Sequence, residues 1–357
     1  MSIPSSYNSR GWLQSIDSGT AYWLNDVSYA PSRNLVSANG KSQHGKRKRS
    51  FALPPVDFLN AISGDFVAAR GKFLLRSEGR DHVDDLPLNG DLPPGVTRLQ
   101  IARDTMAVLR ARHVPPAYGF VNAKKLEGNQ DAADALKLWA SSEPVGNHSY
   151  GHMDLNANPA EAFEREIAEN EPILELLAGA NANWHWLRYP FLREGDTIEK
   201  RRAVRAYLQA HGYRVAQVTL DWEDYLWNSA YARCVAKNDA HSIAWLHSSY
   251  LQTESSYLDL GHQLAQMTYG HDINHVLLLH LGAFSSAILP DALDLLKKKG
   301  FKLVTLEEAE SDPVYQGDPN IGSQYGGTLL ELWIEAKKMK FPSVMQKPFK
   351  QLQEICR

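Results

Sequence analysis

Between residues 81 and 310, helical patterns alternate with short apolar runs, and this alternation leaves the chain few fold classes. A helix is expected after its cap residue Thr97, and the apolar run 118–121 follows it. A later run, 275–281, is typical of a buried strand, and the next helix is expected to begin at Pro290. Strands that alternate with helices predict an α/β domain with a mainly parallel sheet, open or closed into a barrel.

Capping residues and apolar runs predict further helix and strand ends. Asn158 precedes a proline and predicts the start of a helix, and Asp196 begins a pattern that resembles a capping box. The runs 213–220 and 301–306 predict two more strands. A last helix is expected from about Thr328.

Composition divides the chain near residue 80. Residues 1–80 hold 11 basic and 5 acidic side chains, whereas the whole chain holds 38 and 41, so the remainder is acidic. The first segment is rich in Ser, Asn and Gly and carries a basic run at 46–49, which a nuclear-localisation or nucleic-acid-binding arm would also explain. We expect residues 1–80 to form an irregular or disordered extension, residues 81–310 one domain, and residues 311–357 a tail packed on that domain.

Composition also disfavours several classes of protein. The net charge of −3 disfavours nucleic acid as a partner, because neutralising phosphates usually requires a basic excess. No apolar run approaches the ~20 residues that span a membrane. No secretory signal is visible, so the expected location is the cytoplasm by default. The two cysteines, Cys234 and Cys356, are too few for a disulfide framework or a Cys-rich zinc site, and we interpret Cys234 as a small buried residue.

Two histidines four residues apart, His148 and His152, are the first candidates for chemistry. On a helix, this spacing would place both imidazoles on the same side. With one carboxylate they would make a three-ligand site with open positions, suited to a catalytic metal ion; the alternative is a pair of solvated histidines. A second such pair, His271 and His275, is interpreted as part of a loop. No Gly-x-Ser-x-Gly segment occurs, which argues against a serine esterase.

Five short segments occur in a fixed order: Asp84-Asp85, His148-Ser149-x-x-His152, Arg188-Tyr189-Pro190-Phe191, Asp221-x-x-Asp224-Tyr225 and Leu278-Leu279-His280. Together they resemble the motifs of the polysaccharide deacetylase family, the NodB-homology group or carbohydrate esterase family 4. The resemblance covers about residues 81–310, and the Asp-Asp-Leu-Pro form of the first segment is similar to a bacterial subgroup. It implies a distorted, NodB-like (β/α)7-type barrel with its site at the carboxyl ends of the strands. It also implies hydrolysis of an N-acetyl or O-acetyl group on a carbohydrate.

The same resemblance implies how the chemistry is divided. Asp85, His148 and His152 would hold one divalent ion, with zinc as the first choice and cobalt, nickel or manganese as alternatives. A metal-bound water would be the nucleophile, Asp84 the general base and His280 the general acid.

Other residues would position these groups. Arg188 would orient Asp84, and Asp224 would hold or tune His280, with Asp221 as the second candidate for that role. An acetylated carbohydrate would contact residues within or beside the motifs, namely Tyr189, Pro190, Phe191, Trp222 and Leu278. For Trp222, core packing is the alternative.

Two alternative functions follow from the residues themselves. Residues 76–82, which precede Asp84, are polar and charged, and a central strand made of them would bury charge at considerable cost. An inactive, carbohydrate-binding member of the same fold would explain this. An amidohydrolase acting on a small non-sugar amide is the other alternative, because the same chemistry serves any accessible amide.

Overall fold

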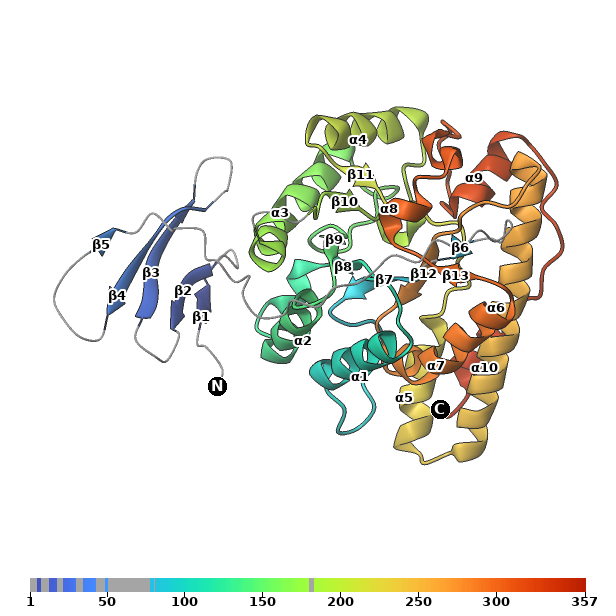
Figure 1. Ribbon diagram of the computed structural model, residues 1–357, viewed down its shortest axis with the longest axis horizontal. Coiled ribbons are helices and arrows are strands. Elements are labelled where there is room, and N and C mark those ends of the chain that lie inside the picture. Colours follow the sequence, from blue (N-terminus) through green and yellow to red (C-terminus); the bar gives the residue numbers. More distant parts are fainter. Residues whose placement is uncertain are drawn as a thin grey trace, which may run out of the picture. The chain divides into compact units, whose positions relative to one another are not determined.

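The structure, a computed structural model, describes residues 5–7, 13–17, 22–29, 35–42, 49–50, 78–79, 81–179 and 183–357 (Figure 1). The chain divides into two compact units, Met1–Leu74 and Leu75–Arg357. The first unit contains an antiparallel sheet of strands β1 (Ser5–Tyr7), β2 (Leu13–Asp17), β3 (Tyr22–Tyr29), β4 (Leu35–Ser42) and β5 (Arg49–Ser50), in that order. Most of the expected extension 1–80, including residues 46–48 of the basic run, lies outside the described residues, and the expected domain boundaries remain predictions.

The second unit contains strands and helices in alternation. Its strands are β6 (Glu78–Gly79), β7 (Asp81–Leu86), β8 (Gly119–Val121), β9 (Val145–Asn147), β10 (Trp186–Leu187), β11 (Arg214–Val215), β12 (Leu277–His280) and β13 (Lys302–Leu303). Its α-helices are α1 (Arg98–Ala111), α2 (Gln130–Ala140), α3 (Ala160–Ala178), α4 (Ile198–Ala210), α5 (Leu226–Ala236), α6 (Ala240–Tyr269), α7 (Ala283–Lys298), α8 (Leu306–Ala309), α9 (Leu329–Ala336) and α10 (Phe349–Glu354). The short 3-10 helices are η1 (Ala123–Leu126), η2 (Pro190–Leu192) and η3 (Pro313–Gln316). Among the described residues, no helix combines the length and the apolar character needed to cross a membrane.

Six parallel strands form the central sheet, in the order β11-β10-β9-β8-β7-β12. The segment after β11 reaches the opposite edge, where Leu220 forms a parallel bridge with Leu277 and its carbonyl accepts a hydrogen bond from Leu278 N at 3.0 Å. This contact curls the sheet into a distorted barrel, as the resemblance implied, and the helices surround the strands (Figure 1). The run 213–220, predicted as one strand, is instead a short strand followed by this bridge.

Large apolar side chains fill the barrel and the layer between strands and helices. Phe120 of β8 and Trp186 of β10 are fully buried in one cluster, and Trp139 of α2 is fully buried in a second. β8 also needs a glycine, because a Cβ at Gly119 would lie 2.1 Å from a methyl carbon of Leu86. Burial of this kind contributes about 25 cal/mol for each Å² of apolar surface and fixes the strand ends that carry the motifs.

The helix starts agree only partly with the capping predictions. Thr97 caps α1 as predicted, and its hydroxyl accepts from Gln100 N at 3.1 Å. Asn158 does not cap α3, because Pro159 occupies the cap position. The cap of α4 is Thr197 rather than Asp196.

The prediction that a helix begins at Pro290 is wrong. The helix α7 starts seven residues earlier, at Ala283, and Pro290 lies inside it. The sequence around Ala283 gives no sign of a helix start, because the capping side chain comes from elsewhere in the chain. Asn228 Oδ1 accepts from Phe284 N at 3.0 Å and from Ser285 N at 3.1 Å. By contrast, the predicted last helix, α9, does begin after Thr328, which forms a capping box with Glu331.

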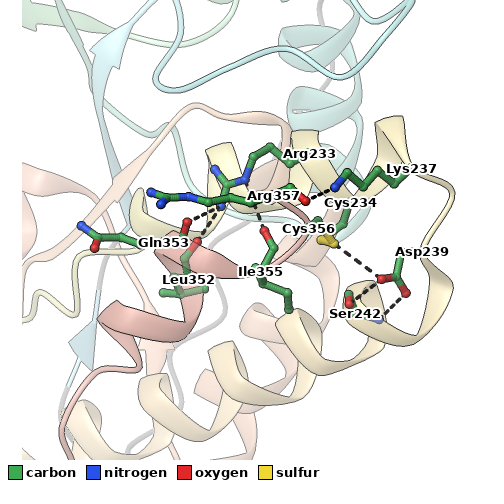
Figure 2. The surroundings of a disulfide bond; sticks show 10 residues. All are labelled: Arg233, Cys234, Lys237, Asp239, Ser242, Leu352, Gln353, Ile355, Cys356 and Arg357. Atoms are coloured by element: carbon green, nitrogen blue, oxygen red, sulfur yellow. Dashed lines mark hydrogen bonds between the residues drawn. A yellow bond between two sulfur atoms is a disulfide. The ribbon is translucent and has the colours of Figure 1, made fainter.

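The two cysteines form a disulfide bond between α5 and the end of the chain (Figure 2). Cys234 is buried, as predicted, but it is bonded to Cys356, with 5.1 Å between the Cα atoms. This pair could not be predicted from the sequence, because the two positions are separated by 122 residues and nothing local indicates that they lie close together.

Candidate active site

Four of the five motifs lie at the carboxyl ends of parallel strands, and the fourth follows the bridge at Leu220. β7 forms despite the polar residues before it, and it places Asp84 and Asp85 at its end. In the register of the sheet, Asp84 lies opposite His280, the last residue of β12. The histidine motif follows β9 and the arginine motif follows β10. Because these strand ends meet at one mouth of the barrel, residues up to 196 positions apart in the chain form one site.

Three side chains could hold a metal ion: Asp85, His148 and His152, whose potential ligand atoms all lie within 4.8 Å of one another. Nε2 of His152 lies 3.4 Å from Asp85 Oδ1, and Nε2 of His148 lies 4.0 Å from the same oxygen. His148 Nδ1 lies 2.8 Å from the carbonyl oxygen of Arg188 and donates to it, which leaves the lone pair on Nε2. Burial lowers the pKa of both imidazoles, so both are neutral, as metal ligands must be.

The two histidines lie in a loop after β9 and not on a helix, so this part of the prediction is wrong. Their rings still come together, with 4.8 Å between centroids, because the loop folds back at Ser149 (φ 60°) and His152 (φ 59°). Positive φ is uncommon for residues other than glycine, and it persists only where surrounding contacts enforce it.

Three asparagines supply those contacts, and sequence reasoning missed them. Asn122 Nδ2 donates to the carbonyls of His148 (2.6 Å) and Ser149 (3.0 Å). Asn147 Oδ1 accepts from Ser149 N and from Nδ2 of Asn170, both at 2.9 Å. All three asparagines are buried. Isolated asparagines between apolar runs look like turn residues in the sequence, so no local signal indicates this network.

Asp85 is held by two further residues that the sequence did not single out. Asn89 Nδ2 donates to Asp85 Oδ2 at 2.7 Å, and Lys125 Nζ donates to Oδ1 at 3.1 Å and to the Asp85 carbonyl at 3.0 Å. Burial opposes ionisation of Asp85, but the positive charges of Lys125 and then His280 act against burial, and the pKa lies well below its usual range. The carboxylate is therefore ionised, which is the form that binds a cation.

Asp84 forms an ion pair with Arg188 inside the barrel. Nη1 of Arg188 lies 3.2 Å and 3.3 Å from the two carboxylate oxygens, and its Nε donates to the carbonyl of Ala216 at 2.8 Å. The exposed fractions are 2% for Asp84 and 1% for Arg188. Burial raises the pKa of Asp84 to about 6, although Arg188 and His280 act in the opposite direction. A carboxyl with this pKa accepts a proton readily near neutral pH.

His280 is paired with Asp224, the first of the two candidates for that role. Burial alone would lower the pKa of His280, but the Asp224 carboxylate outweighs burial and raises the pKa to about 9. Ser285 Oγ also donates to Asp224 Oδ2, at 2.9 Å. Asp221 instead accepts a hydrogen bond from Glu223 N at 2.7 Å, and burial raises the pKa of Asp221 to about 6.

The residues predicted to contact substrate separate into exposed and buried ones. Phe191 is 54% exposed, and its ring lies 4.5 Å from that of His152. Trp222 is 1% exposed and packs edge-on against Tyr250, so it is a core residue and offers no free face to a sugar. The others are buried within the motifs they belong to: Tyr189, Pro190 and Leu278.

Two of the remaining histidine interpretations can be compared with the structure. His271 and His275 lie in the loop before β12, as expected. His275 is fully buried and its Nδ1 lies 3.2 Å from Thr219 Oγ1, whereas His271 is exposed, so the two do not form a second metal site.

Comparison with known proteins adds independent findings. Residues 84–216 match the family model described as polysaccharide deacetylase. A curated chitin deacetylase from Arthroderma benhamiae is 24% identical over 195 residues, a match that spans 54% of this chain and 44% of that relative, so the chain matches less than half of the relative's length.

Solved structures of two similar proteins each match 65% of this chain. The chitin deacetylase of the fungal pathogen Colletotrichum lindemuthianum is 19% identical, with a TM-score of 0.45, over 65% of this chain and 86% of that one. A polysaccharide deacetylase from Bacillus cereus is 19% identical, with a TM-score of 0.42, over 65% and 94%. The family match spans the first three of the five motifs and all three candidate metal ligands. Residues 84–216 are thus similar to the polysaccharide deacetylase family.

Proposed function

We propose that this protein is a metal-dependent hydrolase that removes acetyl groups from an N- or O-acetylated carbohydrate. The observation that carries the proposal is the gathering of Asp85, His148 and His152 beside a carboxyl, Asp84, and an imidazole, His280, whose pKa values are both raised. The match of residues 84–216 to the polysaccharide deacetylase model supports carbohydrate as the substrate class. The chitin deacetylase relative supports an N-acetylated sugar as the first substrate to test.

The donor set fits a first-row divalent ion, zinc first. Two neutral imidazoles and one carboxylate leave coordination positions open, which is typical of catalytic and not of structural zinc. Cobalt, nickel and manganese accept the same donors. When bound, the ion would supply Lewis-acid polarisation of the acetyl carbonyl and would lower the pKa of water.

The protein's own side chains would carry the protons. Asp84, held by Arg188 and with a pKa near neutrality, would take a proton from the attacking water. His280, protonated up to about pH 9, would give a proton to the departing amine or alkoxide. An amine leaves poorly unless it is protonated, so a charged His280 fits amide hydrolysis. The raised pKa of Asp84 makes its carboxylate a better base, and the raised pKa of His280 keeps its imidazole protonated as an acid.

An acetate-release assay tests this proposal. The purified protein, with zinc, would be given N-acetylglucosamine oligomers, O-acetylated xylan oligomers and small linear and cyclic amides. We expect acetate from at least one sugar substrate and a loss of about 100-fold or more in Asp84→Asn. Turnover of the non-sugar amides alone would refute the assignment of substrate class, and glycan binding without acetate release would favour an inactive member of the fold.

We also propose that the protein works in an oxidising compartment rather than in the cytoplasm. The support is the pairing of Cys234 with Cys356, because disulfide bonds are rare in reducing compartments. Thiol titration of protein isolated under alkylating conditions is the test: no reactive thiol is expected, and two thiols per chain would contradict the proposal.

A further inference from the structure

The C-terminal segment of the chain brings a lysine close to the loop that holds His280. Lys347 Nζ donates to Glu223 Oε2 at 2.7 Å, and the ammonium group lies 4.7 Å from the centre of the Tyr257 ring. The Lys347 side chain is only 18% exposed. A lysine that is mostly buried over an aromatic ring and bonded to a carboxylate is held in one position.

The loop that Lys347 contacts is crowded with negative charge. Asp221, Glu223 and Asp224 provide three carboxylates in four residues. The backbone turns sharply, since Glu223 has φ 57° and its N–H donates to Asp221 Oδ1 at 2.7 Å. Like charges at this separation repel, so the turn needs a compensating cation. Lys347 provides one, because it pairs with Glu223 directly and its charge acts against the burial that raises the pKa of Asp221 to about 6.

The segment after Lys347 is fastened to α5. Arg233 Nη2 donates to the carbonyl of Leu352 at 2.7 Å, and its Nε donates to that of Ile355 at 3.3 Å (Figure 2). Leu352 is 3% exposed and belongs to the main core. Cys356, which follows Ile355, is bonded to Cys234 of α5.

The helix that receives this segment is the one that begins at the charged loop. α5 starts at Leu226, immediately after Asp224 and Tyr225, and Cys234 lies in its last turn. The C-terminal segment thus contacts α5 near its end, through the disulfide, and the loop before its start, through Lys347. The disulfide keeps the Cα atoms of Cys356 and Cys234 5.1 Å apart, so the end of the segment stays on α5 while the bond is intact.

We propose that Lys347 is a positioning residue for the general acid: it stabilises the loop 221–225, which carries Asp224, and the Cys234–Cys356 bond with α10 holds Lys347 in place. Lys347 acts through the loop, because its hydrogen bond goes to Glu223 and not to His280. In its effect on turnover, the inference rests on the proposed deacetylase function.

Substitution of Lys347 is the first arm of the test. Lys347→Met should lower kcat about tenfold with KM nearly unchanged, because the loop positions the acid and not the substrate. Lys347→Arg should restore most of kcat, since it keeps the charge. Lys299→Met, which removes another lysine–carboxylate pair, with Asp259, is the matched control and should leave kcat unchanged. A loss in KM alone, or no rescue by arginine, would overturn the proposal.

A double-mutant cycle tests the link to the disulfide. The pair Cys234→Ala and Cys356→Ala should lower kcat in the wild-type background but cause little further loss in Lys347→Met, because both changes would release the same contact. Fully additive losses would overturn the link.

Hydrogen exchange provides a readout that does not depend on activity. Amides of residues 221–225 should exchange faster in Lys347→Met and in the cysteine pair, whereas those of β9 should not change. Unchanged exchange in the loop would overturn the inference whether or not the wild-type protein releases acetate. Faster exchange in a protein without deacetylase activity would instead refute the proposed function alone.

Discussion

The imidazole Nδ1 of His280 lies 2.6 Å from Asp224 Oδ1, and the backbone N–H of His280 donates to the other oxygen, Oδ2, at 2.9 Å. One buried carboxylate therefore fixes both the ring and the main chain of the last residue of β12. Because Nδ1 is used by Asp224, Nε2 is the nitrogen that remains for a substrate. This pair decides in which pH range the protein has a charged acid.

Asp224→Asn should move the alkaline limit of activity to lower pH. In the wild-type protein, His280 stays protonated until its raised pKa, about 9, so kcat should fall as pH rises through that value. Without the carboxylate charge, the pKa should fall towards ~6.5, and activity at pH 8 should drop about thirtyfold. The pH dependence of kcat in both proteins is the measurement, with Asp259→Asn as the control; an unchanged alkaline limb would exclude His280 as the acid.

The same pair should stabilise the fold in a defined pH window. The folded-state pKa of His280 lies above its unfolded value, so the contribution is fully present below about pH 6.5 and is lost as pH rises through about 9. Denaturant unfolding at pH 6 and pH 9.5 should show a larger difference between wild type and Asp224→Asn at the lower pH.

Asp84→Asn should show a dependence of the same sign in a more acidic window. Burial raises the folded pKa of Asp84 to about 6, so the folded state binds a proton more tightly than the unfolded state. The contribution of Asp84 to the free energy of unfolding of the wild type falls as pH rises from ~4 to about 6, whereas the asparagine of the variant does not titrate. In the presence of a chelator, the free energy of unfolding of the variant relative to wild type should rise by at most about 3 kcal/mol across this window. Asp91→Asn, at an exposed position, is the control, and a flat difference would contradict the shifted pKa.

Phe191 and Trp222 should differ in what their substitution damages. Phe191 is 54% exposed beside His152, so Phe191→Ala should raise KM severalfold and change stability by less than about 0.5 kcal/mol. Trp222 is buried in the core, so Trp222→Leu should cost about 2–4 kcal/mol of stability with KM unchanged. Steady-state kinetics and thermal unfolding separate the two effects; a raised KM in the Trp222 variant alone would show that the burial was misjudged.

The alternation of helices and strands was enough to predict the fold class, but not every boundary. Thr97 and Thr328 were predictable as caps because each uses its own side chain on its own helix. The start of α7 was not, because Asn228 supplies the cap from another helix, and a Cβ at Gly282 would lie 2.1 Å from Asn228 Nδ2. Such tertiary contacts have no local trace in the sequence.

The candidate site, like the fold, could be predicted from the sequence only in part. His148 and His152 were identified from their spacing, but the reason given, a shared helix face, was wrong, since positive φ at Ser149 and His152 folds the loop instead. Lys125 could not be identified from the sequence, because a lysine in a polar stretch resembles any solvated lysine. Only the fold brings its ammonium group to the Asp85 carboxylate. Chemistry that depends on residue type could be predicted, whereas positioning that depends on distant contacts could not.

Metal titration is the most direct test of the account. Isothermal titration calorimetry with zinc, checked by elemental analysis, should give one tightly bound ion per chain. His148→Ala should lose this binding, because His148 supplies one of the three ligand atoms, whereas His241→Ala, at an exposed position on α6, should bind as the wild type does. Tight one-to-one binding that persists in His148→Ala, or no binding by the wild-type protein, would contradict the assignment of Asp85, His148 and His152 as the metal site.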